Sequence, residues 1–158
     1  MHRYLEPTED LIRIVAENMR QDDIEEVWAS HRSLPFDALM TSWKLSNLSS
    51  IVEINGELCA MFGVRKMDVL SGRGVPWMLS TNHLVVPANA REFLKGTKSI
   101  VAEMLDACPL LQNYVYTKNR LSIRWLKWIG FTIEAAEPTG KGGELFHRFH
   151  MTKAEYNV

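Results

Sequence analysis

The sequence is poor in cysteine, in excess charge of either sign and in long apolar runs. Its 158 residues include two cysteines, Cys59 and Cys108. Both lie in apolar stretches without the spacing of metal ligands, so we expect buried free thiols rather than a disulfide or a metal site. No apolar run approaches the length that spans a bilayer, and the N-terminus has no secretory signal pattern. We therefore expect the chain in a reducing compartment, most simply a cytoplasm.

The near balance of charge argues against a surface built for nucleic acid. The chain has 18 basic and 19 acidic residues, whereas nucleic-acid surfaces gather Lys and Arg to neutralise phosphates. Hydrophobic residues make up 46% of the chain and charged residues 23%, which is typical of a folded domain. There is no repeat, low-complexity tract or linker. Residues 1–158 are therefore predicted to form one domain.

The first half of the chain changes from helical periodicity to strand-like alternation. Helices are predicted to start after the N-cap Thr8, near Asp22 and at Pro35, and a short strand at residues 3–5 precedes them. Strands are predicted at residues 50–54 and 58–64. Asn55-Gly56 between them is the pair that a type I′ hairpin turn favours. A third strand is predicted from Trp77 to Val86.

In the second half, helices and strands alternate. Helices are predicted over residues 89–107 and 121–129, the second ended by Gly130. Strands are predicted over residues 114–116, 131–134 and 145–151. Interleaved helices and strands together with a hairpin indicate an α/β domain, with a central mixed sheet flanked by helices.

The segment Asn119–Phe131 combines five residue types at a distinctive spacing. Asn119 is followed three positions later by Ser122, then by Trp125, and the helix ends in Gly130-Phe131. This spacing and the order of elements resemble the GNAT N-acyltransferases. The resemblance implies a GNAT-like fold in which acetyl-CoA lies between two strands that part. It also implies that Asn119, Ser122 and Trp125 lie near the pantetheine arm of acetyl-CoA.

A second stretch falls where the resemblance places the pyrophosphate of acetyl-CoA. Gly96 is the one glycine kept from the family's glycine-rich loop. Arg91 and Lys95 carry charge that suits phosphate, and they are equally interpreted as a solvated helix face. The full set implied to bind acetyl-CoA is Leu84, Val85, Val86, Arg91, Lys95, Gly96, Thr97, Asn119, Ser122 and Trp125.

Two departures from the family pattern concern catalysis. Leu126 stands where the family often has a tyrosine that protonates the departing thiolate. Phe93-Leu94 stand where glycines would let the backbone approach phosphate. As catalytic base, we consider His83 on the predicted third strand, because histidine is the residue type most often used as a general base, and Glu53 is the alternative. Each is also interpreted as an ordinary strand residue. No spacing of His, Cys, Asp or Glu predicts a metal site.

Several short blocks also resemble, in order, small GNAT-like proteins of tailed phages related to the internal virion protein A family of short-tailed phages. The blocks are residues 18–20, 26–30, 60–64, 113–115 and 122–127. This resemblance implies a phage product in the host cytoplasm or the virion interior, with a virion or host protein as partner.

Two functions stay open from the sequence. The departures favour a minor internal virion or assembly-associated component with a degenerate acetyl-CoA site. The retained motif permits an active N-acetyltransferase that moves acetyl from acetyl-CoA to an amine of a host or phage target. The sequence specifies neither the acceptor nor the oligomeric state.

Overall fold

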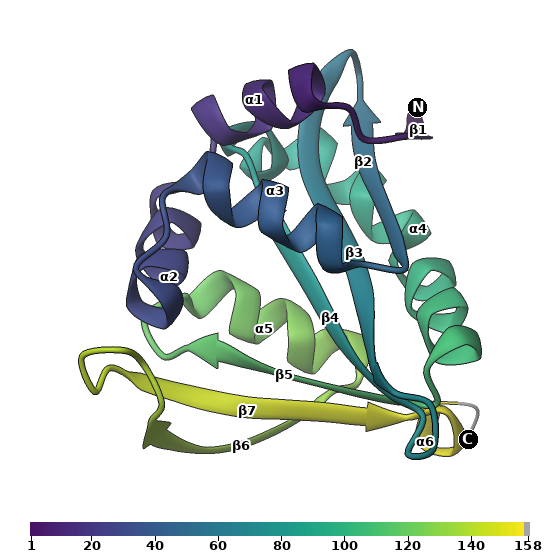
Figure 1. Cartoon of the computed structure of the whole chain (residues 1–158). Helices are drawn as coiled ribbons and strands as arrows, with labels where there is room; N and C mark the ends of the chain where they lie inside the picture. Colours follow the sequence, from purple (N-terminus) through teal and green to yellow (C-terminus); the bar gives the residue numbers. More distant parts are fainter. Residues whose placement is uncertain (157–158) are drawn as a thin grey trace.

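A single mixed sheet with helices on both faces forms the structure, a computed structural model that describes residues 1–156 (Figure 1). The seven strands lie in the order β1-β2-β3-β4-β5-β7-β6. They are β1 (His2–Leu5), β2 (Leu48–Ile54), β3 (Glu57–Asp68), β4 (Arg73–Ser80), β5 (Leu110–Tyr116), β6 (Thr132–Pro138) and β7 (Leu145–Thr152). The helices are α1 (Glu9–Glu17), α2 (Gln21–His31), α3 (Pro35–Leu45), the 3-10 helix η1 (Asn82–Val85), α4 (Pro87–Ala107), α5 (Arg120–Ile129) and α6 (Lys153–Tyr156). The predicted α/β class with a mixed, helix-flanked sheet is confirmed.

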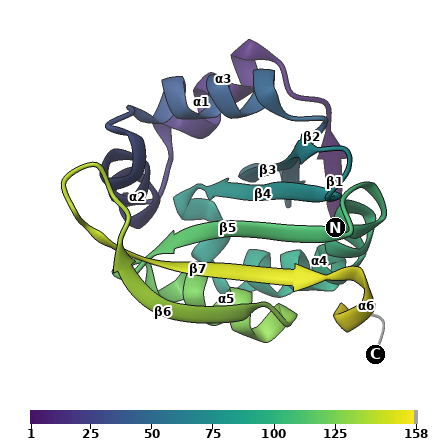
Figure 2. The ribbon, with the colours of Figure 1, turned by 60° about the horizontal axis from the view of Figure 1, so that its bottom comes forward.

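The sheet is buried on both faces because its inner strands carry apolar residues at successive positions. Ile51 and Met61 pack with α1, α2 and α3, whereas Val52 and Phe62 pack with α4 and α5. Figure 2 shows the two groups of helices on opposite sides of the sheet. Among residues 1–156, no helix has the length and apolar character of a membrane span.

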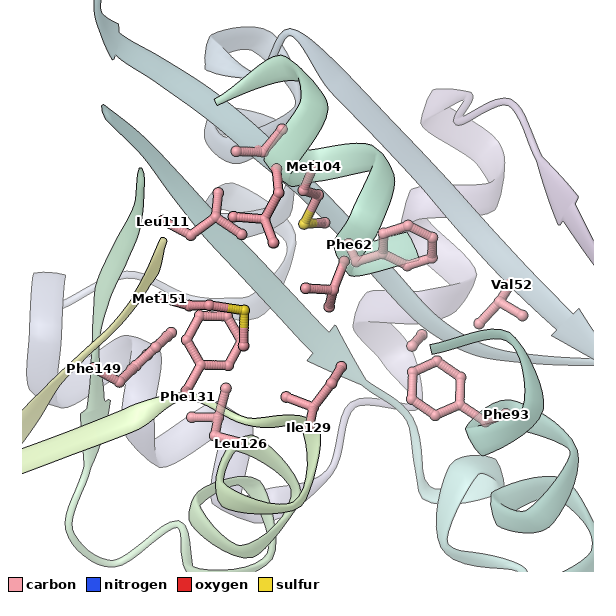
Figure 3. Close-up of a cluster of buried hydrophobic side chains, with 14 of the residues drawn as sticks. Val52, Phe62, Phe93, Met104, Leu111, Leu126, Ile129, Phe131, Phe149 and Met151 are labelled. Atoms are coloured by element: carbon pink, nitrogen blue, oxygen red, sulfur yellow. The ribbon is translucent and has the colours of Figure 1, made fainter. Parts of the chain in front are cut away.

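The larger apolar layer joins α4 and α5 to the sheet. Phe93 and Met104 of α4 lie in the same cluster as Leu126 and Ile129 of α5, and Phe149 of β7 completes it from the sheet (Figure 3). Leu126, at the position where the resemblance implied a tyrosine, is thus a buried core residue. The elements that a GNAT-like site requires are therefore fixed by a continuous apolar layer.

Two local predictions are confirmed by the backbone and the thiols. Asn55 and Gly56 have φ values of 51° and 83°, so both positions of the β2–β3 turn are in the left-handed region that a type I′ turn requires. Cys59 and Cys108 are free and buried.

The predicted third strand is wrong beyond residue 80. β4 ends at Ser80, and residues 82–85 form η1. The cause is Thr81, whose hydroxyl oxygen accepts a hydrogen bond from His83 N at 3.2 Å and donates one to Leu58 O at 2.7 Å. A side-chain cap of this kind starts a helical turn and ends the strand. His83 consequently lies on η1, not on the strand.

Several other boundaries lie further out than predicted. β3 ends at Asp68 rather than at residue 64, and β4 begins at Arg73 rather than at Trp77. α4 begins at Pro87 rather than Asn89, because proline suits the first position of a helix. β5 begins at Leu110 rather than at Tyr114, because its first residues pair with β7.

β4 and β5 are parallel neighbours that pair over only two positions. Arg73 lies opposite Leu110, and Gly74 opposite Leu111; beyond them the strands part. The end of α4 passes very close to this point. A Cβ added at Gly74 would lie 2.6 Å from the Sγ of Cys108 and 2.7 Å from its Cβ. Gly74 therefore lets α4 return into β5 directly beside the point of separation.

We predict that Gly74→Ala destabilises the fold by about 1–3 kcal/mol, the usual cost of extra volume in a packed region. Urea unfolding measures the change. The adjacent Arg73→Ala is the control and should alter stability by no more than about 0.5 kcal/mol. Equal stability of Gly74→Ala and the wild-type protein would contradict this packing.

Candidate functional site

A cavity of about 590 Å³ lies where β4 and β5 part. Its lining comes from both faces of the sheet, so the cavity passes between the two strands. We call its two parts the α2/α3 half and the α4/α5 half. The α2/α3 half is lined by Glu26, Val27, Ser30, Thr41, Leu45 and Trp77. The α4/α5 half is lined by Phe93, Thr97, Val101, Ser122, Trp125 and Phe131.

Two carboxylates of α2 take the place of strand partners at the open end of the gap. Asp23 Oδ2 accepts a hydrogen bond from Ser80 N of β4 at 2.9 Å. Glu26 Oε1 accepts one from Tyr116 N of β5 at 2.8 Å. Residues three apart in a helix share a face, so one turn of α2 reaches both strands. The separation of β4 and β5 is therefore held by α2.

Asp23 belongs to a buried polar group that we call the Arg20–Asp23 cluster. Arg20 Nη2 lies 3.1 Å from Asp23 Oδ1 and donates to Asn119 Oδ1 at 2.9 Å. Asn119 Nδ2 donates to Asp23 Oδ1 at 2.9 Å, and Ser80 Oγ donates to Asp23 Oδ2 at 2.7 Å. Buried charges are tolerated when they are paired and hydrogen-bonded in this way. The cluster ties α2, the end of β4 and the start of α5 together.

The side chain of Asn119 is part of the buried core and is not a cap of α5. It occupies the N-cap position of α5 but makes no capping hydrogen bond. The residue is 1% exposed, and its amide oxygen and nitrogen are engaged by Arg20 and Asp23. The same cluster includes a longer contact of 3.5 Å from Arg20 Nη2 to Ser122 Oγ. Asn119 thus positions α5 from within the core.

Glu26 is a carboxylate in the wall of the cavity, and its pKa is raised to about 8. The largest cause is the loss of water around the carboxylate, and the negative charge of Asp23 adds to it. The Tyr116 N–H bond opposes the shift because it favours the ionised form. A carboxyl group that exchanges a proton near neutral pH can act as a general acid or base.

Three of the residues predicted to bind acetyl-CoA line the α4/α5 half: Thr97, Ser122 and Trp125. The indole Nε1 of Trp125 is buried and has no hydrogen-bond partner among the described residues. Buried N–H groups are nearly always paired, so an unpaired indole donor on a residue that lines the cavity is unusual.

The remaining predicted residues lie elsewhere. Leu84 and Val85 belong to η1, and Val86 caps α4. Arg91 and Lys95 are exposed, and Lys95 Nζ pairs with Glu92 at 2.8 Å. Gly96 faces β1, because a Cβ there would collide with the hydroxyl of Tyr4. A contact of β1 with α4 thus accounts for this glycine.

The two predicted catalytic bases do not border the cavity. His83 Nε2 lies 3.3 Å from Glu57 Oε2, and Glu53 Oε1 accepts from Arg3 Nε at 2.6 Å. Neither residue belongs to the cavity lining. Their catalytic roles stay predictions, and the structure brings neither of them to the gap between β4 and β5.

Sequence reasoning missed Glu26 as a functional residue. The one signal was the helical spacing, which puts Asp23, Glu26 and Val27 on one face of α2. That signal does not show which strands the carboxylates meet. The contact between Glu26 and the backbone N–H of Tyr116 is seen only in the folded structure.

The backbone of Met78 is the last component of the site. In an extended strand, alternate residues direct their N–H and C=O to the same side. Pro76 O accepts from Asn113 Nδ2 at 2.7 Å, and Ser80 N donates to Asp23, so both residues face the gap. Met78 lies between them and faces the gap too, and no residue of β5 pairs with it in the described chain.

No family model matches the chain, and no curated protein sequence matches it. Several solved acetyltransferases have the same fold. Spermidine N-acetyltransferase SpeG from Vibrio cholerae, solved with CoA and spermine, has a TM-score of 0.70 at 14% identity, over 100% of this chain and 98% of that chain. A probable acetyltransferase of the GNAT family from Chromobacterium violaceum has a TM-score of 0.72 at 12% identity, over 99% and 90%. The chain therefore has the GNAT acetyltransferase fold. Its relation to phage virion proteins stays a prediction.

We predict that Asp23→Asn destabilises the protein by about 3–5 kcal/mol, because it leaves the buried guanidinium of Arg20 without its anion. Chemical denaturation measures the loss. Asp22→Asn is the matched control, on the exposed face of the same helical turn, and should cost less than about 1 kcal/mol. Similar losses in the two variants would contradict the role of the cluster.

Glu26 should make stability depend on pH. Its folded pKa of about 8 exceeds that of a Glu in an unfolded chain, about 4.3, so the folded state holds the proton more tightly. This contribution is complete below the unfolded pKa and is lost as pH rises through about 8.

Between about pH 5 and pH 9, the free energy of unfolding of the wild-type protein is therefore expected to fall by on the order of 2 kcal/mol relative to that of Glu26→Gln. Denaturation curves across this pH range give the difference. Glu25→Gln, one residue earlier and exposed, should keep the wild-type slope. A parallel pH dependence in wild type and Glu26→Gln would show that the pKa is not raised.

Proposed function

We propose that the chain is an N-acyltransferase that moves an acetyl group from acetyl-CoA to an amine. The observation that carries this proposal is the cavity that passes through the sheet between β4 and β5. Two reactants that enter from opposite faces meet in such a gap, and holding them together supplies much of the rate enhancement of a transfer reaction. The fold supports the proposal, since SpeG, which shares it, is solved with CoA.

The α4/α5 half fits the pantetheine arm of acetyl-CoA. The arm carries amides, and the unpaired Nε1–H of Trp125 and the backbone of Met78 offer donors and an acceptor to them. Thr97 and Ser122 are small enough to leave room beside the arm. When bound, acetyl-CoA supplies a thioester whose C–S bond breaks as the new C–N bond forms, and its thiol departs as a thiolate.

Glu26 is the group placed to take a proton from the acceptor. An amine attacks only after it loses its ammonium proton, and Glu26 is the carboxylate in the cavity wall. Its pKa of about 8 lies near working pH, where a general base is effective. The bond from Tyr116 N fixes one carboxylate oxygen, so the group is held at the gap. Leu126 is buried and supplies no acid, so the leaving thiolate receives no proton from that position.

A second candidate is a virion or assembly component whose site no longer turns over. One observation favours it. Phe93, in the stretch where glycines were expected, is 5% exposed and lies 6.0 Å from the ring of Trp125 between centroids. This contact between the two rings joins α4 to α5 and narrows the α4/α5 half of the cavity.

Titration with acetyl-CoA by calorimetry and thermal shift tests the proposal. We expect saturable binding at micromolar concentration and a rise in melting temperature, because a ligand of the native state must stabilise it. Trp125→Phe removes the indole donor and should weaken binding about five- to tenfold. Trp128→Phe is the control, since Trp128 is on the same helix and 52% exposed.

No binding at millimolar acetyl-CoA would overturn the enzyme proposal. In that case, recovery of the protein from purified phage particles would support the second candidate.

A further inference from the structure

The α2/α3 half of the cavity contains one carboxylate in an apolar setting. We propose, on the basis of the function proposed above, that the acceptor is a small primary amine with a single positive charge on an apolar or aromatic body. Glu26 binds its ammonium group, and Trp77 and its neighbours bind the body.

The charges around the cavity limit the acceptor to one ammonium. Glu26 is the one acidic side chain in the lining among the described residues. Asp23 is close by, but its two oxygens are engaged by Arg20, Ser80 and Asn119. The lining also contains two basic side chains, His31 and Arg65, and the phenol of Tyr114. A second positive charge would therefore meet no free carboxylate.

Trp77 forms a fixed aromatic wall in the α2/α3 half. Its Nε1 donates to Ser46 Oγ at 2.7 Å, so the indole has its hydrogen bond already. Its ring lies against Gly63, where an added Cβ would be 2.9 Å from Cζ2. Val27 and Leu45 add apolar surface to the same half. A hydrocarbon or aromatic ring is the body that such a wall accepts.

Two hydroxyls in this region are engaged by helix backbone rather than open to a ligand. Ser46 Oγ donates to Ser42 O at 2.6 Å, and Ser30 Oγ donates to Val27 O at 3.3 Å. A hydroxyl bonded to the preceding turn of its own helix contributes little polarity to a neighbouring cavity. The half is therefore more apolar than its residue types suggest.

A polyamine is a poor match for this half. SpeG, the neighbour of similar fold, is solved with spermine, which carries several ammonium groups. In the present chain, a second ammonium drawn into the cavity would lose water without gaining an anion, and that is strongly unfavourable. We therefore expect this chain to differ from SpeG in its acceptor.

Binding of a single ammonium should also release a proton. Below about pH 8 Glu26 is largely protonated, and an ammonium placed against it favours the ionised form. The charged groups that act on Glu26 are Asp23 and Arg20, which pair with one another, and the cavity lining contains two further basic side chains, His31 and Arg65. Proton release is thus a signature of an ammonium at Glu26, and a purely structural role would not produce it.

The experiment measures binding and acetylation of three amines by the whole protein. The probes are 2-phenylethylamine, the amide of Nα-acetyl-lysine and spermidine. Calorimetry at pH 7 in two buffers of different ionisation enthalpy gives affinity and proton release, and product formation with acetyl-CoA gives the acceptor preference. We expect 2-phenylethylamine to bind and react at least tenfold better than spermidine, with release of a proton. Glu26→Gln should weaken its binding at least tenfold and abolish the release, while Glu25→Gln should change it less than twofold.

The outcomes separate this inference from the proposed function. If acetyl-CoA binds but spermidine is preferred, or Glu26→Gln binds 2-phenylethylamine as well as wild type, the acceptor inference is overturned and the acyltransferase proposal stands. Preference for the lysine derivative over 2-phenylethylamine would overturn the small-amine acceptor in favour of a protein side chain. If the amine binds but acetyl-CoA does not, the inference of an amine site at Glu26 stands and the acyltransferase proposal is overturned.

Discussion

The separation of β4 and β5 after Gly74 is the constraint on which the rest of the structure depends. Two parallel strands that part leave backbone groups without partners, and such groups must be satisfied inside a protein. At the open end, α2 provides the missing hydrogen-bond partners, because Asp23 and Glu26 accept hydrogen bonds from the last residues of the two strands. The middle of the gap is left as a cavity. The site therefore exists because α2, and not a neighbouring strand, provides the hydrogen-bond partners at the ends of β4 and β5.

The two carboxylates of α2 have different roles because their surroundings differ. Asp23 is neutralised by Arg20 and surrounded by donors, so it is a structural anion. Glu26 has one backbone donor and little water, which raises its pKa to about 8. Environment, not residue type, separates a carboxylate that holds the fold from one that exchanges protons. The same helix therefore holds the two strands apart through Asp23 and places the carboxylate of Glu26 in the gap between them.

Much of the fold was predictable from local pattern, whereas most of the site was not. The Asn55-Gly56 turn, the helix ended by Gly130 and the α/β order follow from short-range rules. η1 was missed because one hydroxyl, that of Thr81, overrides the apolar run that follows it. Trp125 and Ser122, which were predicted to bind acetyl-CoA, line the cavity, and their role in binding stays a prediction. Glu26 was not predicted, because its role depends on Tyr116, ninety residues away in the chain.

A structure of the protein with CoA tests the central claim most directly. We expect the pantetheine arm in the α4/α5 half, within hydrogen-bond distance of the Met78 backbone and Trp125 Nε1. We expect the thiol to be directed between β4 and β5 toward Glu26. CoA bound elsewhere on the surface, or an α4/α5 half that holds no CoA at saturating concentration, would contradict this expectation.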